Sequence, residues 1–255
     1  MKKLVALLLI AVLVAVAGCS SSAKKTNSTG SLSGSITVYA ASSLTGAFNT
    51  LATQFEAAHP GTKITFSYAA SGALATQITQ GAPADVFASA APKNMATVVS
   101  AGDASNPVNF VKNTGEIAAA PGNPAHIASV ADLAKAGVKV ANCEPTVPCG
   151  VVAAAVFKNA NVTVKPTASE ADVKSTLAVV ESGEVDAGIV YVTDVRAAGS
   201  KVVGIEIPAA QNATTEYPIA PLKGSKNAAL AKAFVDYVTS SDGQKVLSAA
   251  GFLAP

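Results

Sequence analysis

The sequence predicts an α/β fold from the order of its elements, and its composition predicts a buried core. From Ile36 to the C-terminus, short runs rich in β-branched residues alternate with segments of helical periodicity. Such alternation indicates mostly parallel sheets whose strands are joined by right-handed crossover connections. The composition is 50% hydrophobic and 13% charged. The roughly 220 residues from Ile36 onward can therefore bury the core of one large domain or two smaller ones.

The N-terminus carries the pattern of an export signal. The residues MKK are followed by an apolar run from Leu4 to Ala17, which is shorter than the about 20 residues that a bilayer span requires. We interpret residues 1–18 as a signal peptide. The run ends in VAGC, which resembles the bacterial lipoprotein box and implies cleavage before Cys19 and lipidation of that cysteine. An ordinary signal peptide with a chance cysteine is the alternative.

Residues 19–35 are expected to form the lipidated Cys19 and a flexible tether. The segment SSSAKKTNSTGSLSGS after Cys19 is rich in Ser, Gly and Thr and has no apolar periodicity, which is typical of flexible linkers. The sequence therefore predicts an exported protein that a lipid holds at the outer face of the cell membrane.

The first part of the folded region predicts three strands, each followed by a helix. The expected strands are ITVYA (36–40), KITFSYA (63–69) and ADVFAS (84–89). One face of the first helix, at 4-3-4 spacing, consists of Leu44, Phe48, Leu51 and Phe55. Leu74 and Ile78 mark a short second helix, and Pro92 opens the third helix at its favoured first position.

The second part continues the alternation. The expected strands are EIAAA (116–120), VKVANC (138–143), AGIVYV (187–192) and VVGIEIP (202–208). Helices are expected over SVADLAKAG (129–137) and GVVAAAVFKNA (150–160). A further helix after VTVKP (162–166) has an apolar face of Val173, Leu177 and Val180, and a long helix near the C-terminus has one of Leu230, Phe234 and Val238. A last short helix is expected before Gly251.

Four segments of small residues place a helix start after a strand, namely 41–44, 70–73, 147–150 and 171–173. The first N–H groups of a helix have no intrahelical partner and carry about half a positive charge from the helix dipole, so they bind anions without Lys or Arg. Ser43 and Ser71 lie at the carboxyl ends of strands, where open α/β sheets bind ligands. Plain N-capping by serine is the alternative for each segment taken singly.

The order of several motifs resembles one family. ITVYAASSLTGAFNTLATQFE, YAASGALATQI, GAPADVFASA, VPCG and GIVYVTD are similar to segments of the periplasmic molybdate-binding proteins that serve molybdate ABC transporters. The resemblance implies the type II periplasmic-binding-protein fold, in which two lobes, each a mostly parallel sheet flanked by helices, are joined by two crossing strands as a hinge. It places residues 36–115 and 217–255 in one lobe and residues 116–216 in the other.

The same resemblance implies five ligand contacts. They are the hydroxyls of Ser43, Ser71 and Tyr191 and the backbone N–H groups of Cys149 and Val173, where Cys149 replaces the usual alanine of the family. The implied function is capture of molybdate or tungstate and delivery to an ABC permease and its ATPase, by a monomer that is not an enzyme. No cofactor is implied, and molybdenum enters only as the oxyanion.

The donor chemistry agrees with an unprotonated tetrahedral dianion. Hydroxyl and amide groups supply hydrogen-bond donors without a buried charge. A protonated phosphate would also need an acceptor such as a carboxylate, for which Asp172 and Asp85 are the candidates. We expect Asp172 to complement a helix dipole and Asp85 to stabilise a turn.

Other classes of function are weighed against this interpretation. Sulfate, phosphate or a small organic acid is the alternative ligand. A hydrolase has little support, because G-x-S-x-G and H-E-x-x-H are absent and His59 and His126 fall in expected loops. A structural lipoprotein or adhesin would explain the lipid anchor but not the two strand-end serines. The formal net charge of +2 argues against a nucleic-acid partner.

Cys143 and Cys149 are expected to form a disulfide. They are the only thiols that remain once Cys19 is lipidated, and an exported compartment permits oxidation. A zinc site is the rival interpretation, although two cysteines without a nearby histidine supply too few ligands. Two free buried thiols are the other alternative.

Overall fold

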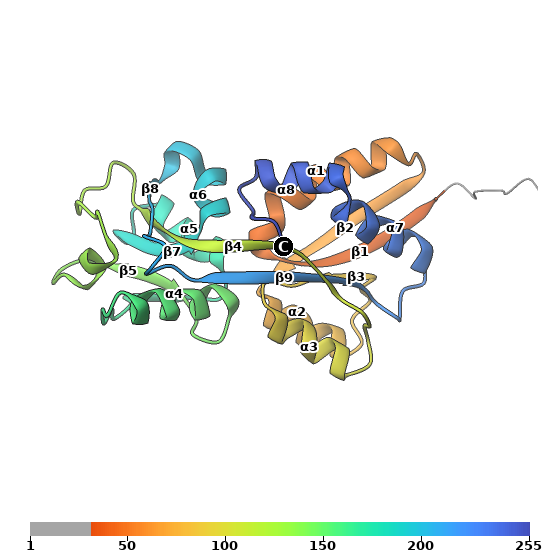
Figure 1. Ribbon diagram of the computed structural model, residues 1–255, viewed down its shortest axis with the longest axis horizontal. Coiled ribbons are helices and arrows are strands. Elements are labelled where there is room, and N and C mark those ends of the chain that lie inside the picture. The colour runs from red at the N-terminus through yellow and green to blue at the C-terminus, as the bar shows by residue number, and fades with distance from the viewer. Residues whose placement is uncertain (1–31) are drawn as a thin grey trace, which may run out of the picture. The chain divides into compact units, whose positions relative to one another are not determined.

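The computed structural model describes residues 32–255, so the predicted signal peptide, Cys19 lipidation and most of the tether lie outside the described residues. Figure 1 labels the main elements. The strands are β1 (Gly34–Ala41), β2 (Thr62–Ala69), β3 (Val86–Ala88), β4 (Val108–Ala119), β5 (Val140–Cys143), β6 (Ala168–Glu170), β7 (Ala187–Tyr191), β8 (Val203–Ile205) and β9 (Thr214–Pro221). The helices are α1 (Thr45–Ala58), α2 (Ser71–Thr79), α3 (Pro92–Ser100), α4 (Pro148–Asn159), α5 (Val173–Glu181), α6 (Val192–Ala198), α7 (Ala228–Thr239) and α8 (Ser241–Ala249), with 3-10 turns η1 (Ser42–Leu44), η2 (Val130–Ala134) and η3 (Gly199–Lys201).

Residues 32–255 form one nine-stranded sheet in the order β2-β1-β3-β9-β4-β7-β5-β6, with β8 paired to β4. The pairs β1–β2, β1–β3, β5–β6 and β5–β7 are parallel. The long strands β4 and β9 are antiparallel to each other and to their other neighbours. The α/β class is therefore confirmed, and antiparallel strands connect its two parallel parts.

The strands β4 and β9 pass from one half of the sheet to the other (Figure 1). The first part of β4, Val108–Thr114, pairs with β9, whereas Gly115–Ala119 pairs with β7. A single strand thus contributes to both halves. This is the arrangement of the two-lobed type II fold, in which crossing strands connect the lobes.

Each half of the sheet buries its own core. In the half that contains β1, successive residues face opposite sides, as a pleated strand requires. Val38 packs with residues of α1, α7 and α8, whereas Tyr39 packs with residues of α2 and α3. The other half has a separate core between β5, β7 and the helices α4 and α5, with Val156 and Val180 fully buried in it.

Several elements differ from the sequence prediction. The helix expected over residues 129–137 is only the 3-10 turn η2. The strand β9 was not expected, because Pro218 lies within it and proline lacks the N–H that a sheet ladder uses. The short elements β6 and α6 were also not expected, and β1 already begins at Gly34, which pairs with Thr62. Within residues 32–255, no helix combines the length and apolar character of a membrane span.

Candidate functional site

A small cavity lies where strand ends from both halves of the sheet meet. All five predicted contact residues line it, together with neighbouring small residues and the N-cap of α5: Ala41, Ser42, Ser43, Ala69, Ala70, Ser71, Ala90, Val147, Pro148, Cys149, Asp172, Val173 and Tyr191. The cavity has a volume of about 10 Å³, close to the least that a single water molecule requires, so it excludes a peptide or a sugar chain.

The half of the sheet with β1 contributes two serine hydroxyls. Ser71 is the first residue of α2, and its Oγ accepts a hydrogen bond from the Ala90 N–H at 2.9 Å. Ser43 lies in η1, and its Oγ is 2.9 Å from the Tyr217 hydroxyl oxygen. The caps Ala41 and Ala70 provide no side-chain acceptor. The unpaired N–H groups at these two helix starts are therefore not occupied by a capping side chain.

The start of α4 lies at the wall of the cavity. Pro148 is the first residue of α4 and has no N–H, so the first available donor of this helix belongs to Cys149. Cys149 forms a disulfide with Cys143 at the end of β5, with the two Cα atoms 5.7 Å apart. The predicted disulfide is thus confirmed. The next residue, Gly150, must be a glycine, because a Cβ at this position would collide with the Glu144 carbonyl.

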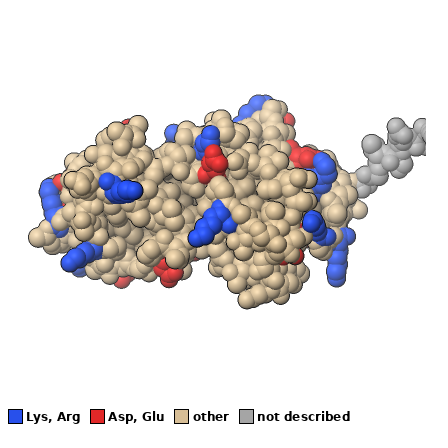
Figure 2. Space-filling model, turned by 60° about the horizontal axis from the view of Figure 1, so that its bottom comes forward, with Lys and Arg blue, Asp and Glu red and all other residues tan. Residues whose placement is uncertain are grey.

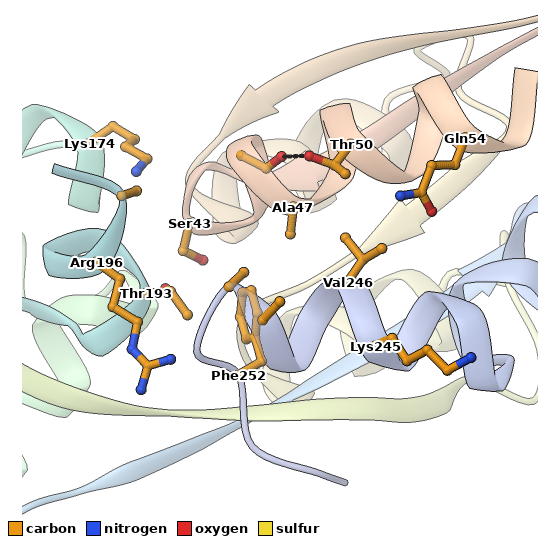
Figure 3. Close-up of a pocket in the computed structure, with 14 residues that line it drawn as sticks. Ser43, Ala47, Thr50, Gln54, Lys174, Thr193, Arg196, Lys245, Val246 and Phe252 are labelled. Atoms are coloured by element: carbon orange, nitrogen blue, oxygen red, sulfur yellow. Dashed lines mark hydrogen bonds between the residues drawn. The ribbon is translucent and has the colours of Figure 1, made fainter. Parts of the chain in front are cut away.

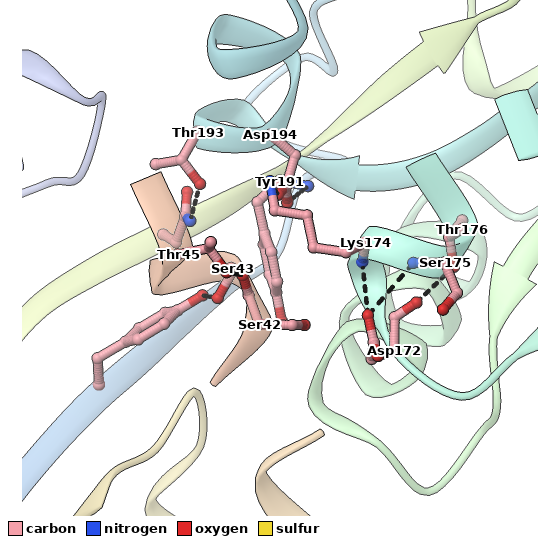
Figure 4. A network of polar contacts seen from close by, with 12 residues as sticks. Ser42, Ser43, Thr45, Asp172, Lys174, Ser175, Thr176, Tyr191, Thr193 and Asp194 are labelled. Carbon is pink, nitrogen blue, oxygen red and sulfur yellow. Dashed lines mark hydrogen bonds and ion pairs between the residues drawn. The ribbon is translucent and has the colours of Figure 1, made fainter. Parts of the chain in front are cut away.

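The start of α5 leaves a second backbone donor. Asp172 is the N-cap, and its Oδ1 accepts hydrogen bonds from the N–H groups of Lys174 and Ser175 at 2.7 and 3.2 Å (Figure 4). These bonds occupy the second and third N–H groups of the helix. The Val173 N–H remains available at the cavity wall. Asp172 therefore precedes the helix as its N-cap rather than lying in the first turn, and from there its carboxylate complements the dipole of α5.

Tyr191 supplies the fifth polar group, at the junction of β7 and α6. Its ring projects between the Ser42–Ser43 turn and Asp172 (Figure 4). The side chain is buried, and its hydroxyl has no hydrogen-bond partner among the described residues. Burial, with contributions from Tyr217 and Asp194, raises the pKa of the hydroxyl well above its ordinary value, so it keeps its proton. An unpartnered buried hydroxyl is rare in proteins, and at the wall of this cavity it is suited to donate a hydrogen bond to a ligand.

A buried carboxylate ties together the two helix starts of this half. Asp194 is fully buried in the first turn of α6, where Oδ2 accepts the Tyr191 N–H at 3.2 Å. Its Oδ1 lies 2.8 Å from the Lys174 ammonium group of α5. Burial raises the pKa of Asp194, and the Lys174 charge opposes this shift. Asp194 thus fixes the backbone of Tyr191 relative to the start of α5.

The other candidate residues have structural roles or lie elsewhere. Asp85 accepts the Thr37 N–H at 2.7 Å and a hydrogen bond from Ser225, and it does not line the cavity. His59 packs on Phe55 with ring centroids 4.5 Å apart, and His126 lies in the loop after β4. Neither histidine lines the cavity with the serines. Within residues 32–255, no three His, Cys, Asp or Glu side chains come together as a metal-binding group.

A larger cavity of about 530 Å³ adjoins Ser43, between the helices α1 and α8 of one half and α5 and α6 of the other. Figure 3 shows Ser43 between Lys174 and Arg196 on one side and α1 on the other.

Positive and negative side chains are interspersed on the face shown in Figure 2, so this face has no continuous basic patch for nucleic acid.

Sequence reasoning missed two partners of the predicted site. Tyr217 contacts Ser43 across 174 residues of sequence, and Ala90 contacts Ser71 across 19 residues. The first partner lies on the unexpected strand β9. The motif GAPADVFASA contains Ala90, but a backbone N–H donor leaves no side-chain signal in the sequence.

Comparison with known proteins identifies the family of this chain. The family described as bacterial extracellular solute-binding protein matches residues 36–253. The molybdate-binding protein ModA of Mycobacterium tuberculosis is 42% identical over 255 residues, which cover 99% of this chain and 97% of that protein.

Two solved structures share the fold. The substrate-binding domain of a molybdenum ABC transporter, described as putative, from Clostridium difficile is 30% identical with a TM-score of 0.66, over 87% of this chain and 99% of that chain. The periplasmic molybdate-binding protein of Azotobacter vinelandii is 21% identical with a TM-score of 0.77, over 86% and 99%. The chain therefore belongs to the bacterial extracellular solute-binding protein family.

Proposed function

We propose that this protein captures molybdate, or the closely similar tungstate, in the small cavity and delivers it to an ABC permease and its ATPase. The observation that carries the proposal is that five residues with available donor groups line one cavity, with the Tyr191 hydroxyl lacking a partner within residues 32–255. The names of the relatives from Mycobacterium and Azotobacter support molybdate as the ligand. A role in solute binding, and not in catalysis, follows from the family.

The donor set suits a dianion that carries no proton. The proposed contacts are the hydroxyls of Ser43, Ser71 and Tyr191 and the N–H groups of Cys149 and Val173. Hydrogen bonds to a charged acceptor are stronger than neutral ones. A site of donors alone binds such an anion without burying a cationic side chain. The one carboxylate at the wall, Asp172, is directed to the backbone of its own helix.

We further propose the lobe boundaries that the sequence suggested. Residues 36–115 and 217–255 form one lobe, residues 116–216 form the other, and β4 and β9 are the hinge. The separate cores of the two halves of the sheet support this division. The proposed contacts come from both lobes, so the bound anion would hold the lobes together.

The family places this protein outside the cytoplasm. We propose that it is a monomer held to the cell membrane by a lipid on Cys19. Cys19→Ala should release the protein from the membrane fraction, and mass spectrometry of the wild-type N-terminus should show the lipid. An N-terminal Cys19 without a lipid would contradict the anchor but not the ligand.

The test of the ligand is calorimetric titration of the mature chain, with Cys19→Ser so that it stays in solution. We expect molybdate and tungstate to bind far more tightly than sulfate or phosphate, in line with the relative from Mycobacterium tuberculosis that is named a molybdate-binding protein. Equal affinity for sulfate and molybdate would contradict this selectivity. Tight phosphate binding would instead indicate that Asp172 accepts a proton from the ligand.

A further inference from the structure

The Tyr217 hydroxyl contacts Ser43 but does not line the cavity itself. Its oxygen lies 2.9 Å from Ser43 Oγ, and Tyr217 is not among the lining residues. The side chain is fully buried on β9. Its ring packs edge-on against Phe110, Phe252 and the cavity residue Tyr191, with centroids 6.3, 5.4 and 6.3 Å away. Tyr217 thus presents its hydroxyl to Ser43 from a fixed position.

The direction of this hydrogen bond decides what Ser43 can offer a ligand. A serine hydroxyl has one proton and two lone pairs. If Ser43 donates to Tyr217, only its lone pairs remain for the cavity, and these repel an oxyanion. If Tyr217 donates, the Ser43 proton is available to the ligand. Burial also raises the pKa of Tyr217, so its hydroxyl keeps the proton that it would donate.

Ser71 shows the second arrangement with no ambiguity. Its Oγ accepts from the Ala90 N–H at 2.9 Å, and a backbone N–H can only donate. The Ser71 proton is therefore available to a ligand. If Tyr217 donates to Ser43, it has the same role for Ser43 that the Ala90 N–H has for Ser71. Both serines then direct their protons to the same cavity.

We infer that Tyr217 is a positioning and specificity-determining residue, an inference that rests on the proposed function. Its hydroxyl donates to Ser43 Oγ, which fixes Ser43 as a donor to the bound oxyanion. When the Ser43 proton points at the anion, this position favours an unprotonated anion oxygen over the P–OH group of a partly protonated oxyanion such as hydrogenphosphate. Tyr217 therefore increases selectivity for fully deprotonated oxyanions over protonated ones.

A double-mutant cycle tests this inference, using calorimetry on the mature chain with Cys19→Ser. The anion is molybdate, or whichever of molybdate, tungstate, sulfate and phosphate binds the wild type most tightly. Tyr217→Phe should weaken binding about tenfold, because Ser43 loses the hydrogen bond that orients it. In the Ser43→Ala background the same change should have less than about a twofold effect. Equal losses in both backgrounds would show that Tyr217 acts only through packing.

The affinity ratio between molybdate and phosphate gives a second readout. Tyr217→Phe should lower this ratio, because Ser43 can then rotate and accept the proton of hydrogenphosphate. An unchanged ratio with a lower molybdate affinity overturns the specificity role. Tyr237→Phe is the matched control, since it removes one tyrosine hydroxyl that donates to Gln54 at 2.8 Å outside the cavity. It should leave both affinities unchanged.

A crystal structure of the wild-type complex with molybdate provides a measurement that does not depend on the folding of a variant. We expect Ser43 Oγ to contact the anion and to keep its hydrogen bond to Tyr217. A Tyr217 hydroxyl that itself contacts the anion overturns the inference. A wild-type protein that binds none of the four anions overturns both this inference and the proposed function, whereas an additive cycle overturns only the inference.

Discussion

The two halves of the molecule prepare their ligand groups in different ways. In the half with β1, both serine hydroxyls already have internal partners, Tyr217 for Ser43 and the Ala90 N–H for Ser71. In the other half the Tyr191 hydroxyl has no partner among the described residues. The first half is therefore organised before a ligand arrives, and the second half gains a hydrogen bond only through the ligand.

The helix starts differ in the opposite sense, because those of the second half are the more restricted. The caps of η1 and α2, Ala41 and Ala70, bring no side-chain acceptor to the unpaired N–H groups. The starts of α4 and α5 are restricted by Pro148, by the disulfide of Cys149 and by the Asp172 cap. The second half thus limits which N–H groups face the cavity, whereas the first half supplies hydroxyls. Disturbing one half should therefore affect binding and stability differently from disturbing the other.

The largest effect is expected from Gly150→Ala at the start of α4. A Cβ there would collide with the Glu144 carbonyl group, which is backbone and cannot rotate away. Overpacking of this kind costs about 3 kcal/mol and exceeds the roughly 1 kcal/mol that alanine gains over glycine in a helix. We expect a large loss of molybdate affinity and a lower free energy of unfolding in urea.

Gly46→Ala is the control for this prediction. Gly46 lies in α1, and a Cβ there has no neighbour within 4 Å. The change should stabilise the protein by up to about 1 kcal/mol and leave molybdate affinity unchanged. A Gly150→Ala variant as stable as Gly46→Ala would show that the Glu144 turn can move without consequence.

The next largest effect separates Tyr191 from Ser71. Tyr191→Phe and Ser71→Ala should each weaken molybdate binding about ten- to a hundredfold, because each removes a hydrogen bond to a charged ligand. Their effects on the thermal stability of the ligand-free protein should differ. Tyr191→Phe removes a buried hydroxyl without a partner, so thermal stability should rise or stay the same. Ser71→Ala leaves the Ala90 N–H without its acceptor, so stability should fall.

Calorimetric titration and thermal unfolding of the two variants, each without and with molybdate, measure these effects. Equal destabilisation of both ligand-free variants would show that Tyr191 has an internal partner in solution. The contrast between the two halves would then be lost.

The sequence predicted the site where local patterns determine it. A strand followed by small residues and a helical face is a local signal, and it located Ser43, Ser71 and the starts of α4 and α5. The strand-like AGIVYV segment predicted only the strand β7, and Tyr191 was assigned as a ligand contact through the resemblance of GIVYVTD to the molybdate-binding proteins. These signals need no information about distant parts of the chain.

The remaining features depend on contacts between distant residues. Tyr217 meets Ser43 only because β9 pairs with β3 and β4, and the prolines of β9 conceal its strand character. The burial of Asp194 also has no local signal, since the residue lies in a helix too short to be detected by periodicity. The helix predicted over residues 129–137 was wrong in type, because only a 3-10 turn forms there.

A smaller effect is expected from the disulfide of the second half. Cys143 and Cys149 are six residues apart, and so short a loop should contribute roughly 2 kcal/mol to stability. Reduction should lower the melting temperature by about 4–8 °C for a domain of this size and weaken molybdate binding modestly, because the Cys149 N–H is held less firmly. Thiol titration of the unfolded, unreduced chain should find neither cysteine reactive. Two reactive thiols would rule out the bond.

The smallest effect concerns Asp132, a carboxylate of the second half that lies away from the cavity. Hydrogen bonds from Lys135 and from the Ala128 N–H lower the pKa of Asp132 from its ordinary 3.8 to about 2. Because the pKa is lower in the folded state, the ionised group stabilises the fold above pH 4, and this contribution is lost as the pH falls from about 4 to 2.

Asp132→Asn should therefore lower the melting temperature at neutral pH, and the difference from wild type should shrink to nothing between pH 4 and pH 2. Molybdate affinity at neutral pH should not change, because Asp132 does not line the cavity. Thermal unfolding of both proteins across this pH range, with titration at pH 7, measures the two quantities. A loss of molybdate affinity in this variant would show that the general stability of the second half, and not only its cavity groups, controls binding.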